Sequence, residues 1–267
     1  MRPLVTRDND WTIRQRLPGW LMTAEVLHGL RVTETPGTAA FGFVLPNGER
    51  RDLTLAPIDV DAFGARYGFN SAPVVRGRPP LWLRQAATPL TISTLQHGRI
   101  VYVSYKRVTV QTGAAAQRIL RLAKAKRFRR VIVDVRLNGG GDNHTYIPLL
   151  AALRGRAVNR YARPVVLMGR ATFSAAQNFI SELEQRPRPV FVGEPSGGSP
   201  NLYGDNRPID LPGLGLTAFV PQIYWVKSRP DDPRVQIEPD VLVDLGSADF
   251  FAGRDPVLAA ALALPLR

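Results

Sequence analysis

The chain has 267 residues, 45% of them hydrophobic and 21% charged, and it contains no cysteine. This length and composition fit a globular protein with one large α/β domain and a smaller appendage, and they exclude disulfides, thiolate metal sites and a cysteine nucleophile. No apolar run reaches the ~20 residues of a membrane-spanning helix, and residues 1–11 lack the apolar segment of an export signal. We therefore expect a chain that, as written, is cytoplasmic and has no integral membrane segment.

The formal net charge of +13 comes from 35 Lys and Arg against 22 Asp and Glu. The densest basic segment, residues 118–130, mixes Arg and Lys with apolar residues and has no acidic residue. We interpret it as the solvated face of a helix that leads into a strand, since no aromatic platform or nucleic-acid motif accompanies it. We predict no nucleic-acid partner, no cofactor and no metal site.

Residues 1–70 are predicted to form a small module, a partial peptide-binding-like or cap element. A helix is expected at 23–30, and apolar runs at 41–45 and 52–55 flank a Pro-Asn-Gly turn, which is typical of a β-hairpin. Pro and Gly residues then punctuate the chain, and we interpret 71–94 as a linker.

The remaining residues, 95–267, are predicted to form the larger domain, in which strands and helices alternate. Strands are predicted at 100–105, 131–135, 165–168, 190–192 and 216–220, and helices at 114–125, 146–153 and 174–183. Strands separated by one helix each imply crossover connections, and hence a largely parallel sheet with helices on its faces. The predicted fold class is therefore α/β.

Three loops that follow predicted strands carry unusual residues. The loop at 134–142 contains three successive glycines, whose N–H groups could turn toward a carbonyl oxygen or an anion. The loop at 169–177 presents Ser174 where a strand ends and a small-residue helix begins, either as a nucleophile or as a helix cap. The loop at 193–201 is rich in small residues and carries one carboxylate, Glu194, so it could line a cleft.

In order and spacing, four sequence motifs resemble those of the tail-specific, or C-terminal processing, serine protease family. They are Asp-x-Arg-x-Asn-Gly-Gly-Gly at 134–141, Thr-Phe-Ser-Ala-Ala at 172–176, Glu-Pro-Ser-Gly-Gly at 194–198 and Glu-Pro-Asp at 238–240. The Pro-Asn-Leu-Tyr-Gly-Asp stretch at 200–205 is similar to the bacterial subgroup without the usual lysine. The resemblance covers about residues 95–260, and it implies a crotonase-like fold of stacked β-β-α units with a partial small N-terminal module.

The resemblance also implies a mechanism and a polypeptide substrate. Ser174 would attack the scissile carbonyl and form an acyl-enzyme that water hydrolyses. The oxyanion would be held by the N–H of Ala175 and an N–H from the Gly139-Gly140 turn. Arg136 and Asn138 are candidates for binding substrate, but Arg136 could instead pair with Asp134 and hold the loop.

No general base for Ser174 is evident in the sequence. Many members of the family activate the serine with a lysine placed after it, but the chain has no lysine from Phe128 to Val226, and Lys227 would have to fold back. Of the three histidines, His144 is a candidate base on reach alone, whereas His28 is expected to be structural and His97 to lie in a turn. Glu194 and Glu238 are alternative orienting carboxylates.

The missing base is explained most economically if the sequence begins late. Residues 5–10 and 25–30 resemble the far side of a peptide-binding module whose first half is absent. Family members also carry an N-terminal export signal and a cap that supplies a histidine. A protein with such a signal would be periplasmic or secreted.

Two other functions fit the same fold. The first is a catalytically weak or inactive protein that binds a hydrophobic ligand or a peptide, which the missing base favours and Ser174 opposes. The second is a crotonase-type acyl-CoA enzyme, which would share the paired N–H oxyanion hole but has no use for a serine at the helix start.

Overall fold

The structure is a computed structural model, in which contacts divide the chain into two compact units. The smaller unit comprises Met1–Arg7 and Ile13–Ser71, and the larger comprises Asp8–Thr12 and Ala72–Arg267. The residues described are 8–45, 47–59, 75, 77–85, 87–125, 128–185 and 187–265.

The small unit contains helices and one hairpin. Helix α1 (Asp10–Leu21) starts in the segment that belongs to the large unit, and α2 (Ala24–Gly29) and the antiparallel strands β1 (Ala39–Val44) and β2 (Arg50–Leu55) follow. The predicted helix at 23–30 and the predicted hairpin are confirmed. Helix α1 was not predicted, because Pro18 lies inside it and proline removes a helical hydrogen bond.

A six-stranded sheet forms the centre of the large unit. Its strand order is β10-β7-β6-β5-β4-β3, and all neighbours are parallel except β3 and β4. The predicted parallel sheet is therefore confirmed in its centre. The strands are β3 (Leu90–Leu95), β4 (Ile100–Tyr105), β5 (Arg130–Asp134), β6 (Val165–Met168), β7 (Val190–Gly193) and β10 (Val241–Leu242).

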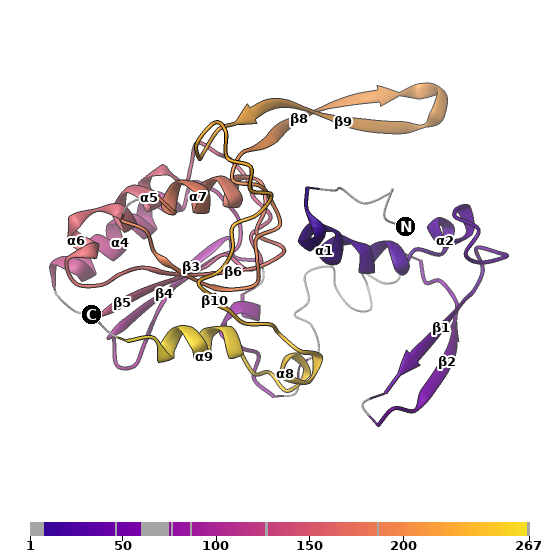
Figure 1. The fold of residues 1–267 in the computed structure, drawn as a ribbon, viewed down its shortest axis with the longest axis horizontal. Coiled ribbons are helices and arrows are strands. Elements are labelled where there is room, and N and C mark those ends of the chain that lie inside the picture. Colours follow the sequence, from indigo (N-terminus) through magenta and orange to yellow (C-terminus); the bar gives the residue numbers. More distant parts are fainter. Residues whose placement is uncertain are drawn as a thin grey trace. The chain divides into compact units, whose positions relative to one another are not determined.

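Helices cover both faces of this sheet (Figure 1). One face carries α4 (Thr112–Lys124), α5 (Ile147–Arg154), α6 (Arg156–Asn159) and α7 (Ala175–Leu183), and the other carries α9 (Pro256–Ala263). A short helix, α8 (Ser247–Phe251), precedes α9. The helices predicted at 114–125, 146–153 and 174–183 correspond to α4, α5 and α7.

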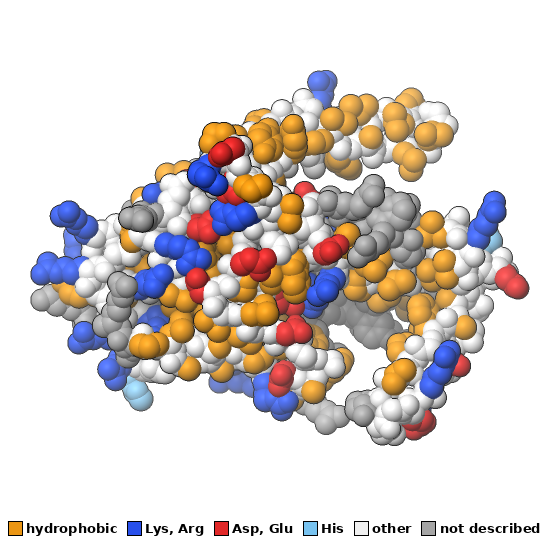
Figure 2. All heavy atoms as spheres, in the orientation of Figure 1, with side chains coloured by type: hydrophobic (Ala, Val, Ile, Leu, Met, Phe, Trp, Pro, Cys, Tyr) orange, Lys and Arg blue, Asp and Glu red, His pale blue; other side chains and the backbone are white. Residues whose placement is uncertain are grey.

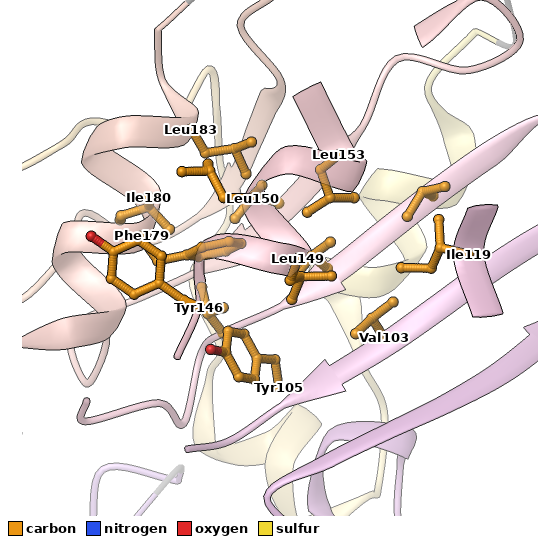
Figure 3. Close-up of a cluster of buried hydrophobic side chains, with 14 of the residues drawn as sticks. Val103, Tyr105, Ile119, Tyr146, Leu149, Leu150, Leu153, Phe179, Ile180 and Leu183 are labelled. Atoms are coloured by element: carbon orange, nitrogen blue, oxygen red, sulfur yellow. The ribbon is translucent and has the colours of Figure 1, made fainter. Parts of the chain in front are cut away.

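The main core lies between the sheet and the helices α4, α5 and α7. Figure 3 shows Leu149, Leu153 and Phe179 from the helices packed toward Val103 and Tyr105 of β4. These side chains are fully buried, and full burial of each such residue contributes about 1.5–3 kcal/mol. Such packing makes the strand ends, where the glycine and serine loops start, a rigid platform.

Two sequence predictions need correction. The predicted strand at 216–220 is part of β9 (Leu216–Trp225), which pairs with β8 (Leu202–Leu211) in a separate antiparallel hairpin and not with the sheet. The predicted linker at 71–94 reaches too far, because Leu90–Leu95 is strand β3 and the 3₁₀ turn Leu81–Leu83 buries Trp82 and Leu83. Residues 71–74, 76 and 86 lie outside the described part.

The surface of the large unit mixes both charge signs, as Figure 2 shows, and the β8–β9 hairpin exposes several large hydrophobic side chains. Among the residues that the structure describes, no helix is long and apolar enough to cross a membrane.

Candidate active site

Ser174 adopts a backbone conformation that few residues other than glycine adopt. It directly precedes helix α7, with φ of 53° and ψ of −127°. Non-glycine residues with such angles carry strain of about 1–3 kcal/mol and are concentrated at functional sites. The Ser174 hydroxyl does not cap α7 and forms no hydrogen bond to any described residue. The helix-cap alternative is therefore excluded in this structure, and the hydroxyl is available for chemistry.

Hydrogen bonds tie the serine loop to the loops that follow β5 and β7. The Thr172 hydroxyl donates to Val135 O (2.9 Å) and accepts from Gly169 N–H (3.2 Å). Phe173 N–H donates to Asn138 O at 3.1 Å, and Gly197 N–H donates to Thr172 O at 3.0 Å. The three loops that the sequence singled out thus meet at one edge of the sheet.

The glycine loop touches the serine directly. Gly140 has φ of +116°, and a Cβ atom placed on it would lie 2.7 Å from Ser174 Cβ and 3.0 Å from Ala175 N. Within the described residues the Ala175 N–H donates no hydrogen bond, whereas Gly140 N–H donates to Asn138 Oδ1 at 3.0 Å. Ala175 N–H and the Gly139-Gly140 turn therefore lie next to the serine, although the N–H of Gly140 already has a partner.

Asn138 and Arg136, the candidate substrate-binding residues, are engaged by the protein itself. Asn138 is fully buried, and its Nδ2 donates to Tyr105 O at 3.0 Å. The Arg136 guanidinium contacts Asp134 (2.6 Å) and Asp255 (2.8 Å). Burial alone would lower the pKa of Arg136, but these two carboxylates raise it well above its ordinary value. Both side chains hold the loop, and their binding of substrate stays a prediction.

Glu194 lies beside the serine loop. Its carboxylate contacts Arg170 Nε at 3.4 Å, and its side chain is only 13% exposed. Burial raises the pKa of Glu194, Arg170 lowers it, and the nearby Asp244 raises it further. Glu238 is exposed and accepts a hydrogen bond from Gln236 Nε2 at 2.5 Å. In the described part of the chain neither carboxylate contacts a histidine.

The candidate bases are not in contact with Ser174. His144 is exposed, and its ring packs edge-on against Trp225 with 6.0 Å between centroids. Lys227 Nζ donates to Glu182 Oε1 at 2.5 Å. Glu182 lies eight residues after Ser174 in α7, which corresponds to ~12 Å along the helix axis. Lys227 therefore does not fold back onto the serine.

The other two histidines have only local contacts or turn geometry in the described residues. His28 is exposed and its Nδ1 lies 3.2 Å from Thr33 O, and His97 lies in a turn with φ of 55°. Among the described residues, no group of three or more His, Cys, Asp and Glu could hold a metal ion.

Two buried side chains near the serine were missed by the sequence analysis. Gln177 Oε1 and Asn178 Oδ1 are buried in α7, three and four residues after Ser174, and have no hydrogen-bond partner among the described residues. Residues at this spacing lie on the same helix face as Ser174. Buried polar atoms without a partner are uncommon and call for an explanation. The signal available in the sequence was the pair of polar residues Gln177 and Asn178 directly after the small residues that begin the helix.

The strain at Ser174 leads to a stability prediction. Ser174→Gly is expected to raise the free energy of unfolding by about 1 kcal/mol, because glycine adopts positive φ without steric cost. Ser199→Gly is the matched control, since Ser199 does not have a positive φ. Urea unfolding followed by circular dichroism measures both. A destabilised Ser174→Gly variant would show that the backbone at this position is not strained.

Comparison with known proteins identifies neighbours in structure but not in sequence. No family model and no curated protein matches the chain. Mature CPAF complexed with lactacystin is 13% identical, with 89% of this chain and 71% of that chain covered and a TM-score of 0.52. The photosystem II D1 C-terminal processing protease is 18% identical, with 82% and 61% covered and a TM-score of 0.45. The tricorn protease is 18% identical, with 84% and 22% covered and a TM-score of 0.41.

Two of these three neighbours are named as proteases. At such identities the likeness to CPAF shows the fold, a mixed α/β protein with a parallel-rich sheet. The chain spans 61% of the length of the photosystem II protease, less than two thirds of it.

Proposed function

We propose that the chain is a serine-type peptidase of the tail-specific family, in the subgroup without the usual lysine, and that Ser174 is its nucleophile. The observation that carries the proposal is the Ser174 conformation. Its φ of 53° and ψ of −127° present an uncapped hydroxyl at the start of α7, beside the Gly140 turn. The parallel sheet covered on both faces supports the finer assignment to crotonase-like stacked β-β-α units.

The proposed reaction proceeds through an acyl-enzyme. Ser174 Oγ forms a bond to the scissile carbonyl carbon and gives its proton to a base. The C–N bond then breaks, and the leaving amine takes up that proton. Water hydrolyses the ester and returns the proton to Ser174. The Ala175 N–H and an N–H of the Gly139-Gly140 turn would stabilise the negative charge on the carbonyl oxygen.

A fluorophosphonate probe tests this proposal. The wild-type chain is expected to form a covalent adduct at Ser174, detected by mass, because the probe reacts with activated serines. Ser174→Ala is expected to lose the adduct completely. Ser199→Ala, a change of the same kind in the neighbouring loop, is expected to keep it. A folded wild-type chain that takes up no probe would contradict the proposal.

A binding protein on the same fold is the second candidate function. It is favoured by one observation: within the described residues, neither His144 nor Lys227 contacts Ser174. If it is correct, the fluorophosphonate experiment gives no adduct, while the folded chain binds a peptide or a hydrophobic ligand with equal affinity before and after Ser174→Ala.

A further inference from the structure

A cavity of about 400 Å³ opens on the α9 side of the sheet, at the β3 edge. Strand register places Thr91 opposite Ser104 and Ser93 opposite Tyr102. The alternate residues of β4, Val101 and Val103, belong to the core under α4 and α5, so the hydroxyl-bearing residues face the other way. Ser174, at the start of α7, belongs to the opposite face (Figure 1).

On the α9 side of the sheet, the side chains change from apolar to hydroxyl-bearing near the cavity. Helix α9 contacts β6 and β7, where Val165, Leu167 and Val192 form an apolar cluster with it. Beyond the reach of α9, the face turns to hydroxyls, and the segment around Leu81–Leu83 covers it instead of a helix. An antiparallel strand pair that no helix covers commonly carries polar side chains on its open face, and here those side chains line the cavity together with Leu81 and Leu95.

Two arginines and several hydroxyl groups supply hydrogen-bond donors to the cavity. Arg78 and Arg84 line it, and within the described residues neither forms an ion pair. The hydroxyls of Thr91, Ser93 and Ser104 likewise form no hydrogen bond to another described residue. Asp134 accepts from the hydroxyl of the lining residue Tyr102 at 2.5 Å and pairs with Arg136.

The two guanidinium groups repel each other. Burial and the like charge of Arg78 lower the pKa of Arg84. Arg84 is nevertheless fixed in place, since its Nε donates to Pro79 O at 2.6 Å and its carbonyl accepts from Lys106 Nζ. An anion between the two guanidiniums would relieve this repulsion and satisfy the free donors.

From this geometry we propose that the cavity binds a small ligand through a phosphate or carboxylate group, held by Arg78 and Arg84 and by the hydroxyls of Thr91, Ser93 and Ser104. The volume accommodates more than a single inorganic ion. The site lies on the other face of the sheet from Ser174 and does not depend on the proposed peptidase activity.

Isothermal titration calorimetry at 150 mM NaCl, a salt level that screens diffuse charge, tests this site. Pyrophosphate and succinate are the two probes, and they distinguish a phosphate group from a carboxylate group. At least one probe is expected to bind saturably with one site per chain. The double variant Arg78→Gln/Arg84→Gln is expected to weaken that binding at least tenfold, and Thr91→Val, which leaves the charge unchanged, to weaken it severalfold.

The control for net charge is Arg118→Gln/Arg121→Gln on the exposed side of α4, which removes the same two charges. It is expected to bind the probe as the wild type does. Equal weakening in both double variants, or no saturable binding of either probe to the wild type, would overturn the proposal. Circular dichroism of each variant ensures that a loss of binding is measured on a folded chain.

Discussion

Replacing Arg136 with Met is expected to lower the free energy of unfolding by about 3–5 kcal/mol. The guanidinium is nearly buried and contacts both Asp134 and Asp255, whose side chains are only 3% and 9% exposed. Removing it leaves two carboxylates buried without a positive partner. Urea unfolding followed by circular dichroism at pH 7 measures the change.

The matched control is Arg254→Met, in which an exposed pair with Asp249 is broken. Arg254 is 62% exposed, so this pair should contribute less than about 1 kcal/mol. Equal effects of the two substitutions would contradict a structural role for the buried pair.

Arg136 also connects distant parts of the chain. Asp255 caps α9 by accepting from Leu258 N–H at 3.0 Å, and at the same time it accepts from Arg136 Nη1 at 2.8 Å. The glycine loop after β5 is thereby fixed to the helix on the opposite face of the sheet. The sequence motif suggested that Asp134 and Arg136 pair, but nothing in the sequence pointed to Asp255.

The sequence predicted the elements of the sheet because their signals are local. The buried strands at 131–135 and 165–168 are continuous apolar runs, and the helices between them are amphipathic or rich in small residues. The strand at 216–220 was predicted equally well as a segment but assigned to the wrong sheet. Strand partners depend on long-range pairing, and the exposed hairpin of β8 and β9 carries no local mark that separates it from a sheet strand.

The candidate site was predictable in part for the same reason. Linked motifs identified the loops that carry Gly140, Ser174 and Gly197, and the structure brings these loops together. The unused hydroxyl and the positive φ of Ser174 depend on how the loops pack, so they became visible only in three dimensions. Contacts such as the one from Asn9 Nδ2 to Ser196 O (3.1 Å) span 187 residues and have no sequence signature.

Gly140→Ala is expected to abolish fluorophosphonate labelling and to lower the free energy of unfolding by about 2–5 kcal/mol, combining backbone strain and overpacking. The new Cβ would lie 2.7 Å from Ser174 Cβ, and it would need a φ of +116°. Ser174 must therefore move away from its present position beside the Gly140 turn and the Ala175 N–H. Probe labelling and urea unfolding of the same protein sample measure both effects.

Two neighbouring glycines separate loss of the site from loss of stability. Gly139→Ala places its Cβ where no atom lies within 4 Å. The free energy of unfolding should therefore stay within about 0.5 kcal/mol of the wild-type value, and the probe should label this variant as it labels the wild type. Gly141→Ala drives its Cβ into Val108 O with a φ of +146°, so it should destabilise the chain without a direct contact on Ser174. If the folded fraction of Gly141→Ala still reacts with the probe while folded Gly140→Ala does not, the defect lies in the geometry around the serine. Labelling of folded Gly140→Ala at the wild-type rate would show that the close approach of this glycine has no part in activating Ser174.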